Sequence, residues 1–344
     1  MRQAIGIDLG RSPVIGILTD INGRMLERSD IAIPMDAPFD YVLEDIKTII
    51  RRLNRIEVTG ICLGSPGWID MERGICRFSP NYPMWKDVDL ITGLKEEFKL
   101  PVFALNDVNA AALGEMYYGA GKVEMKSETP IYLTVSEGFL FDATSKKNES
   151  YRVDNMVFIA VGVGIGAGIV INGELVVGKN YGAGEVGHVT IEPDGPPCTC
   201  GNSGCLEALC SLNAIKRGVA EGLKRGWETS LTDYVKSADE VTFKIIQECA
   251  RKNDELTMKI LSIVGRYLGM GLAVVANVLD PELIVIGGDI VPLLDILHPL
   301  IMKELMNRIK MISYNKVSFV AANLGELSGA YGAAAYVFQR LYSI

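Results

Sequence analysis

The sequence has little of what a nucleic-acid-binding or membrane-spanning protein needs. Its 344 residues include 34 Lys and Arg against 42 Asp and Glu, so the formal net charge is −8. Phosphate binding needs clustered basic residues, and a broad nucleic-acid surface is therefore not expected. The most apolar passage, Met156 to Ile171, has 16 uncharged residues, fewer than a membrane span needs, and glycines interrupt it. We expect no membrane partner and no direct nucleic-acid binding.

The N-terminus lacks the features of a secretory leader. A β-rich run begins within a few residues of Met1, where a leader would have a basic start and then an apolar stretch. We therefore expect a cytoplasmic protein, whose thiols stay reduced. With 49% hydrophobic and 22% charged residues the composition is that of an ordinary globular protein, and the length allows two domains.

Histidine is scarce, with two in the whole chain, yet one of them shares a short passage with three of the seven cysteines. His188, Cys198, Cys200 and Cys205 have the spacing H-x9-C-x-C-x4-C in a loop rich in glycine and proline. One imidazole and three thiolates make a closed tetrahedral site for structural Zn2+. Free thiols or a disulfide between neighbours are the alternatives, but cytosolic cysteine clusters with histidine favour metal. The spacing predicts a zinc ion held by these four residues.

The remaining cysteines and the second histidine carry no such pattern. They lie in apolar or helical contexts without metal spacing, which is typical of small core residues rather than reactive thiols. His298, on a helical face, is expected to be a packed or surface residue rather than a catalyst. The four cysteines expected in the core are Cys62, Cys76, Cys210 and Cys249.

The cysteine-rich passage also resembles a known family. The run E-x-G-H from Glu185 to His188 is followed by C-x-C-G-x-x-G-C-L-E from Cys198 to Glu207. These motifs resemble the ROK family, which contains sugar kinases and sugar-sensing transcriptional repressors. The resemblance implies an α/β, two-domain actin-like ATPase (ribonuclease H-like) fold with an interdomain cleft, and a dimer. It further implies that the zinc loop presents Glu185, His188 and Glu207 to a bound hexose, with His188 using one ring nitrogen for zinc and the other for sugar.

A first candidate phosphate loop lies near the N-terminus. Two β-rich runs, 4–9 and 14–19, are joined by a tight turn, which on the residues alone is only a β-hairpin. In actin-like ATPases, as the resemblance implies, this hairpin meets the nucleotide phosphates and its acid lies near Mg2+. The family's kinases continue with a second glycine and a threonine, whereas this chain has Arg11, which adds bulk, and then a serine. The nucleotide-binding candidates here are Asp8, Gly10 and Ser12.

Sugar-binding candidates follow the next strand. A helix over 39–53 and a buried strand over 58–63 predict an α/β domain with parallel pairing, in which ligands bind beyond the carboxyl ends of strands. The strand runs into the turn that ends at Gly67, and by the resemblance this turn faces the sugar. Asn81, in FSPNYP, occupies a similar family position, although on the residues alone it is a turn residue.

The next strand, 101–105, leads into Asn106 and Asp107 and a helix over 110–118. On sequence alone Asp107 is expected to be the N-cap of that helix. A carboxylate at a strand end and helix start can also accept a proton from a substrate hydroxyl as phosphoryl transfer begins. The resemblance assigns this catalytic role to Asp107 and has Asn106 hold a sugar hydroxyl.

A second glycine loop, GVGIGAG, follows a strand that ends near residue 161. By itself such a loop is weak evidence for phosphate, because strand turns and close packing use the same residues. By the resemblance it lies opposite the first loop, while a later Gly-Gly turn flanks the adenosine. The kinases usually have threonine where this chain has Val163, which cannot donate a hydrogen bond. The nucleotide-binding candidates here are Gly162, Gly164, Gly166, Gly287 and Gly288.

The fold implied by the resemblance divides the chain in two. Residues 1–118 with the C-terminal helix, about 326–344, are expected to form a smaller α/β domain, and 119–325 a larger one with the zinc loop. Residues 122–155 are an insertion relative to the family's kinases, and their polar centre, 145–150, predicts an exposed hairpin tip or a mobile loop. Further helices are expected over 206–225, 256–279 and 325–342, and a strand over 283–286.

Two functions of different class fit this pattern. The first is an ATP-dependent, glucokinase-like hexose kinase in which Asp107 deprotonates a hexose hydroxyl, the 6-hydroxyl by expectation, with ATP and Mg2+. The second is a non-catalytic sugar sensor related to the family's repressors. Arg11 and Val163 favour the sensor, whereas Asp107, a full set of sugar residues and the lack of a helix-turn-helix before Met1 favour the kinase. The motifs do not distinguish glucose, mannose and N-acetylated hexosamines.

Overall fold

The computed structural model describes residues 2–10, 12–34, 37–123, 151–310 and 318–342. Arg11 and most of the 122–155 insertion, including 145–150, lie outside the described residues. The ends of that insertion form a two-stranded ladder of β9 (Lys122–Val123) and β10 (Tyr151–Arg152).

Two five-stranded sheets with the same topology organise the chain. In each, a strand pairs antiparallel with the next strand on one side and parallel with a later strand on the other. The first sheet has the order β3-β2-β1-β4-β8 and the second the order β13-β12-β11-β14-β15. The strands of the first are β1 (Gln3–Asp8), β2 (Val14–Asp20), β3 (Met25–Ile31), β4 (Val58–Ser65) and β8 (Val102–Asn106). Those of the second are β11 (Met156–Val161), β12 (Ile165–Ile171), β13 (Glu174–Leu175), β14 (Leu283–Gly287) and β15 (Ser318–Ala321).

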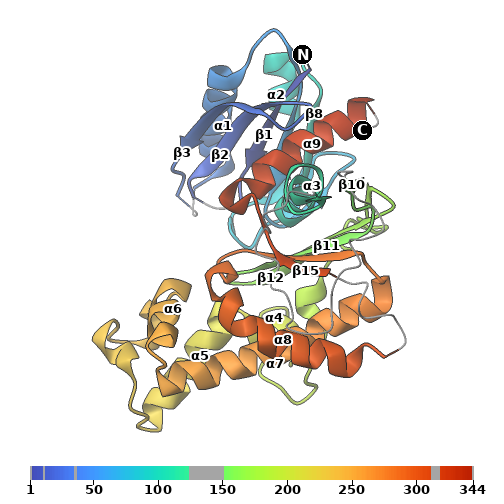
Figure 1. Ribbon diagram of the computed structural model, residues 1–344. Helices are drawn as coiled ribbons and strands as arrows, with labels where there is room; N and C mark the ends of the chain where they lie inside the picture. The colour runs from blue at the N-terminus through green and yellow to red at the C-terminus, as the bar shows by residue number, and fades with distance from the viewer. Residues whose placement is uncertain (1, 11, 35–36, 124–150, 311–317, 343–344) are drawn as a thin grey trace.

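Helices fill the space between the two sheets and cover their outer faces, giving five layers (Figure 1). The middle layer is α3 (Asp107–Tyr118) and α9 (Ser328–Tyr342), which share one buried core with residues of both sheets. The first sheet is covered on its other face by α1 (Phe39–Leu53) and α2 (Thr92–Phe98), next to a small sheet of β5 (Trp68–Asp70), β6 (Ile75–Phe78) and β7 (Lys86–Asp89). The second sheet is covered by α4 (Leu206–Cys210), α5 (Leu212–Lys224), α6 (Phe243–Arg251), α7 (Glu255–Leu279) and α8 (Leu294–Arg308).

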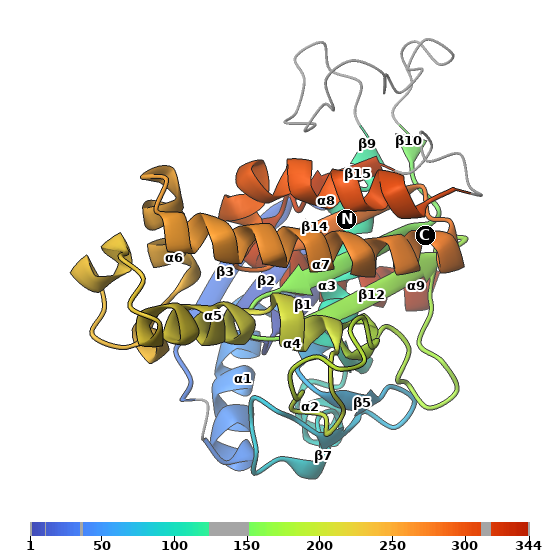
Figure 2. The same ribbon diagram turned by 90° about the horizontal axis from the view of Figure 1, so that it is seen from below.

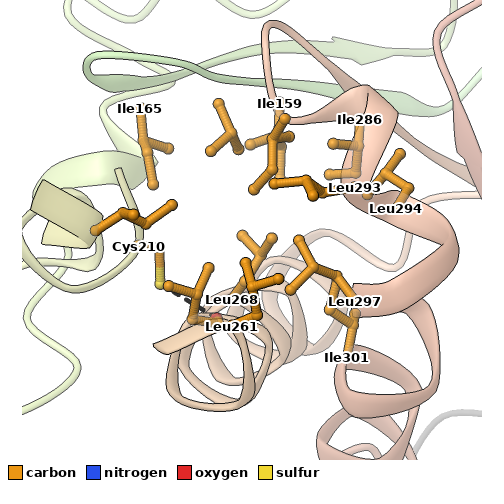
Figure 3. Close-up of a cluster of buried hydrophobic side chains, with 14 of the residues drawn as sticks. Ile159, Ile165, Cys210, Leu261, Leu268, Ile286, Leu293, Leu294, Leu297 and Ile301 are labelled. Atoms are coloured by element: carbon orange, nitrogen blue, oxygen red, sulfur yellow. Dashed lines mark hydrogen bonds between the residues drawn. The ribbon is translucent and has the colours of Figure 1, made fainter. Parts of the chain in front are cut away.

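The outer core of the second sheet is built from α7 and α8, which lie side by side (Figure 2). Leu261 and Leu268 of α7 meet Ile159 and Ile286 of the sheet in one fully buried cluster (Figure 3). Within the described residues α7 is the one helix with the length and composition of a membrane span, and 61% of that window is buried inside the fold. Burial against the sheet explains its apolar sequence.

The helix predicted over 206–225 is wrong in one respect, because it is two helices. Ser211 is extended, with ψ 172°, and its hydroxyl accepts a hydrogen bond from Ala214 N at 3.4 Å, so it caps a new helix. The N–H of Leu212, the first residue of that helix, is donated to Gly162 O at 2.9 Å instead of continuing α4. The break between the two helices therefore allows the Leu212 N–H to bind the second glycine loop.

Other expectations are confirmed. The helix over 39–53 has the predicted bounds, since its apolar residues are spaced for one buried face. The strand over 58–63 is found as β4, and the long apolar helix as α7. The last helix is preceded by one 3-10 turn, Gly325–Leu327. The four cysteines without metal spacing are all buried, and burial raises the pKa of Cys210 well above its usual value.

Candidate functional site

The first glycine loop begins where β1 ends, at Asp8. The Asp8 carboxylate is buried and accepts the N–H of Gly10 at 2.8 Å, which closes a tight turn. Asn81, from the loop between β6 and β7, donates its side-chain amide to Gly10 O at 3.1 Å. The Ser12 hydroxyl accepts the N–H of Ile33 at 3.2 Å. Asn81 thus lies beside the first loop, and the Ser12 oxygen is already in a structural hydrogen bond.

Asn106, and not Asp107, is the N-cap of α3, so the N-cap prediction is wrong. The Asn106 side-chain oxygen accepts the N–H groups of Val108 and Asn109 at 2.9 and 3.1 Å. Its amide nitrogen donates one hydrogen to Gly67 O at 3.1 Å, which leaves the second amide hydrogen for a ligand. The capping geometry moves Asp107 to the first helical position, where the positive end of the helix dipole favours a carboxylate.

Gly10 separates two carboxylates. A Cβ at Gly10 would lie 2.6 Å from Asp107 Oδ2, closer than real Cβ contacts, and 3.0 Å from Asp8 Oδ1, which is also tight. A larger residue at position 10 would therefore have to displace one of the two carboxylates. Asp8 and Asp107, which are 99 residues apart in sequence, therefore meet around one backbone position.

Gly67 must also be a glycine. Its φ is +106°, and a Cβ there would overlap Phe78 O. The turn it forms ends β4 and lies directly against Asn106 through the hydrogen bond to its carbonyl. The structure thus brings four of the predicted sugar-side residues to one edge of the first sheet: Gly67, Asn81, Asn106 and Asp107.

The second glycine loop turns between β11 and β12 and lies next to the Gly-Gly turn. Gly162 N donates to Gly164 O at 2.9 Å. A Cβ at Gly162 would lie 3.4 Å from Asp289 Oδ2, so the turn at Gly287 and Gly288 is its neighbour. The side chain of Val163 is 60% exposed at the tip of this loop. An apolar tip offers backbone N–H groups but no side-chain donor.

β12 links the acid at the start of α3 to the zinc loop. A Cβ at Gly166 would lie 3.1 Å from Val108 Cγ2, next to Asp107 in sequence. On the same strand Ala167 N donates to Gly184 O at 3.1 Å, and Gly187 packs so closely that a Cβ would overlap Ile165 O. Gly166 therefore lets α3 pack closely on β12, and Gly187 lets the zinc loop pack closely on the same strand.

The geometry of the four predicted metal ligands fits zinc. Their ligand atoms all lie within 4.8 Å of one another, with Cys200 Sγ and Cys205 Sγ 3.8 Å apart and His188 Nδ1 3.6 Å from Cys198 Sγ. In a tetrahedron with Zn–S bonds near 2.3 Å, two sulfurs are about 3.8 Å apart. Burial and the two neighbouring thiols raise the pKa of Cys205 to about 12, so a cation is needed to hold three thiolates together.

The two ring nitrogens of His188 face different groups. Nδ1 points to the cysteine cluster, while Nε2 is 3.8 Å from Glu185 Oε2. The Glu185 side chain is 67% exposed. With Nδ1 on a metal, Nε2 carries the ring proton and is a donor beside an exposed carboxylate.

Glu207 has structural contacts that the sequence did not indicate. Its Oε2 accepts the N–H of Ile165, in the second glycine loop, at 2.9 Å, and its Oε1 accepts the hydroxyl of Thr199, in the zinc loop, at 3.2 Å. One carboxylate thus bridges the two loops. The E in C-L-E is a visible signal in the sequence, but which donors it meets depends on the fold.

Trp68 is a contact that sequence reasoning missed. It directly follows Gly67, is 51% exposed, and donates its indole N–H to Asn180 O at 2.6 Å. Asn180 lies in the segment that leads into the zinc loop, so this bond joins the small β5-β6-β7 sheet to the second half of the chain. The signal available in the sequence was a tryptophan directly after Gly67.

These features define a class of protein first. A repeated five-stranded sheet, two glycine loops and a helical middle layer make this a two-domain α/β protein of the actin-like ATPase fold. The particular family is also shown. The chain belongs to the ROK family, whose sequence model matches residues 4–141 and 142–340.

Its relatives include both kinases and regulators. It is 31% identical to a glucokinase of Thermotoga maritima over 98% of each chain. A ROK family glucokinase from Streptomyces griseus, solved in complex with glucose and AMPPNP, is 27% identical with a TM-score of 0.75, covering 98% of this chain and 99% of that one. A ROK transcriptional regulator described as a homolog of the E. coli MLC protein is 29% identical with a TM-score of 0.80, covering 99% and 78%.

Proposed function

We propose that this chain is an ATP-dependent hexose kinase, glucokinase-like, that phosphorylates the 6-hydroxyl. The observation that carries the proposal is the meeting of Asp8 and Asp107 around Gly10. Phosphoryl transfer needs a base on the acceptor hydroxyl and an acid on the metal side of the phosphates, and two carboxylates flanking a backbone amide turn supply both. Glucokinase relatives at 31% and 33% identity support the same reaction class.

Asp107 is the proposed base. Its carboxylate takes the proton of the hexose hydroxyl while that oxygen attacks the γ-phosphorus, and the bond to the β–γ bridging oxygen breaks to release ADP. Its place at the first position of α3 puts the carboxylate at the positive end of the helix dipole, on the edge of the first sheet.

The acceptor sugar is proposed to lie between the first-sheet edge and the zinc loop. Asn106 offers its second amide hydrogen, Glu185 an exposed carboxylate, and His188 its Nε2 proton. Such mixed donors and acceptors suit the vicinal hydroxyls of a hexose. The full set of proposed sugar-binding residues is Gly67, Asn81, Asn106, Asp107, Glu185, His188 and Glu207.

Nucleotide phosphates are proposed to lie between the two glycine loops, and adenosine against the Gly-Gly turn. Asp8 is the residue proposed to hold Mg2+, which would neutralise charge on the phosphates when bound. Zinc held by His188, Cys198, Cys200 and Cys205 keeps the sugar loop folded. The proposed nucleotide-binding residues are Asp8, Gly10, Ser12, Gly162, Gly164, Gly166, Gly287 and Gly288.

The second candidate is a sugar sensor without catalysis. The exposed Val163 favours it, because a side chain without a donor occupies the tip of the second phosphate loop. The similarity to a ROK transcriptional regulator agrees with it. A sensor keeps sugar affinity without phosphoryl transfer.

ADP release from Mg-ATP across a panel of hexoses distinguishes the two. We expect turnover with at least one hexose, glucose first, since glucose is the sugar in the related kinase complex. Sugar binding is measured by calorimetry on the same panel, because a sensor would bind a hexose without releasing ADP. Tight binding of a hexose with no ADP released by any member of the panel would refute the kinase.

We also propose how the parts are arranged in solution. Residues 1–118 with 326–344 form one domain and 119–325 the other, with the substrates in the cleft between them. The assembly is a homodimer in the cytoplasm, as the family resemblance implies.

A further inference from the structure

Glu115 is a fully buried acid that no step of the proposed reaction uses. It lies two turns after Asp107 on α3, and no Lys or Arg of the described residues forms an ion pair with it. A buried carboxylate is costly unless hydrogen-bond donors satisfy it. Hydrogen-bond donors must therefore satisfy both oxygens of the Glu115 carboxylate.

Four donors satisfy them, and three come from the far end of the chain. Asn323 N and Leu324 N donate at 3.0 and 2.8 Å, and the Ser328 hydroxyl at 2.7 Å. The fourth donor is Ala120 N at 2.9 Å, in the turn that follows α3. Glu115 therefore ties α3 to the segment that starts α9, whose first residue is Ser328.

The start of α9 is in turn packed on Asp8. A Cβ at Gly329, the second residue of α9, would overlap the Asp8 carboxylate. Two more glycines keep the helices this close, because a Cβ at Gly114 would overlap Ser328 O and one at Gly332 would overlap Ala110 O. The first turn of α9 thus lies directly against the Asp8 side chain.

We propose that Glu115 is a positioning residue for the nucleotide side of the site: it holds the N-terminus of α9 against Asp8. Through α9 it sets where the Asp8 carboxylate lies relative to Gly10, and through α3 it sets the distance to Asp107. The inference rests on the proposed function only for the role of Asp8 toward nucleotide. The coupling from Glu115 to the first glycine loop is a property of the fold and is testable without turnover.

Three substitutions break this chain of contacts at different points. Glu115→Gln replaces one carboxylate oxygen, which accepts two hydrogen bonds, with an amide NH2 that faces those two donors. Ser328→Ala removes one of the four donors, and Gly329→Ala pushes a methyl into the Asp8 carboxylate. Gly93→Ala is the matched control, since Gly93 is also the second residue of a helix and a Cβ there meets only Leu43 at 3.7 Å.

The experiment is hydrogen exchange of the full chain at the Gly10 amide, with calorimetry for glucose and for Mg-AMPPNP. Loss of one charge-assisted hydrogen bond in Ser328→Ala should speed Gly10 exchange by about tenfold. Displacement of the Asp8 carboxylate in Gly329→Ala should have a similar effect, and Glu115→Gln a larger one. Mg-AMPPNP affinity should fall by a similar factor while glucose affinity and the Gly93→Ala protein stay unchanged. If Glu115→Gln does not fold, the other two variants decide.

Faster exchange at Asn323 and Leu324 with no change at Gly10 would mean that Glu115 only stabilises the fold, and would overturn the proposal. An equal loss of glucose and nucleotide affinity would overturn it too. Absence of ADP release from the unmodified protein counts against the proposed kinase alone, because Gly10 exchange reports the coupling independently.

Discussion

At the scale of single residues, the site depends on close approaches that a Cβ would obstruct. Gly10, beside the carboxylates of Asp8 and Asp107, is the clearest case, since a Cβ there would lie 2.6 Å from Asp107 Oδ2. Two predictions belong at this scale.

Asp107→Asn keeps the shape of the side chain and removes the proposed base. We expect turnover to fall by about 10² to 10⁴-fold with sugar affinity nearly unchanged. Steady-state ADP release and sugar calorimetry measure the two effects. Asp40→Asn is the matched control, because Asp40 is an exposed acid in the first turn of α1. Retained turnover in Asp107→Asn would assign the proton to another group.

Val163→Thr adds a hydroxyl at the tip of the second glycine loop. If phosphate lies there, the new donor should raise Mg-ATP affinity by about two- to tenfold, and the gain should be larger with Arg11→Gly, which restores the family's kinase pattern. Nucleotide calorimetry measures it. Val278→Thr on α7, where the valine is 74% exposed, is the control. An unchanged affinity would place the phosphates elsewhere.

At the scale of elements, the zinc loop is ordered although it has almost no hydrophobic core of its own. It is held by short-range bonds such as Ile191 N to Gly204 O at 2.8 Å and by the four-ligand cluster. Such a loop gains its stability from metal, which contributes on the order of 10 kcal/mol in small zinc elements.

Cys200→Ser, or chelation, should therefore unfold the loop over 182–207 and weaken sugar binding. Zinc content by metal analysis and proteolysis within the loop report its state, and addition of Zn2+ to the chelated protein should restore both the loop and sugar affinity. A protein purified without zinc, or a serine variant with unchanged sugar affinity, would contradict the prediction.

Trp68→Phe tests the second contact between elements. Phenylalanine keeps an aromatic ring but loses the N–H that donates to Asn180 O. The segment that leads into the zinc loop should then be attached less firmly to the small β5-β6-β7 sheet. We expect sugar affinity to fall by about two- to tenfold with the zinc content unchanged. Trp227→Phe, in the α5–α6 region, is the control. Equal sugar affinities of Trp68→Phe and the unmodified protein would show that the bond is incidental.

At the scale of the whole molecule, the two sheets are joined by a middle layer of α3 and α9, which shares one buried core with residues of both sheets. Such an arrangement allows the outer parts to rotate about the helices. Glucose should therefore close the molecule, and small-angle scattering should show a smaller radius of gyration with glucose than without. A non-binding polyol is the control, and an identical scattering profile with saturating glucose would rule out closure of this kind.

The sequence by itself determined the parts of the site that depend on local chemistry. The zinc ligands are close together because short segments separate His188, Cys198, Cys200 and Cys205 in the sequence. The helix over 39–53 has its predicted bounds because its apolar residues recur with the helical period on one face. Asn106 as N-cap was missed for a local reason, since both Asn106 and Asp107 are good caps and backbone geometry chose between them.

Only the tertiary structure decided which distant residues meet. Nothing in a single sequence says that Gly329 lies on Asp8, that Glu115 accepts the N–H groups of Asn323 and Leu324, or that Glu207 bridges two loops. These contacts arise because two copies of one sheet topology face each other across α3 and α9, and glycines let backbones approach there. The spacing of residues along the chain determines which side chains can ligate zinc. The packing of the two sheets on α3 and α9 determines where the carboxylates of Asp8 and Asp107 lie.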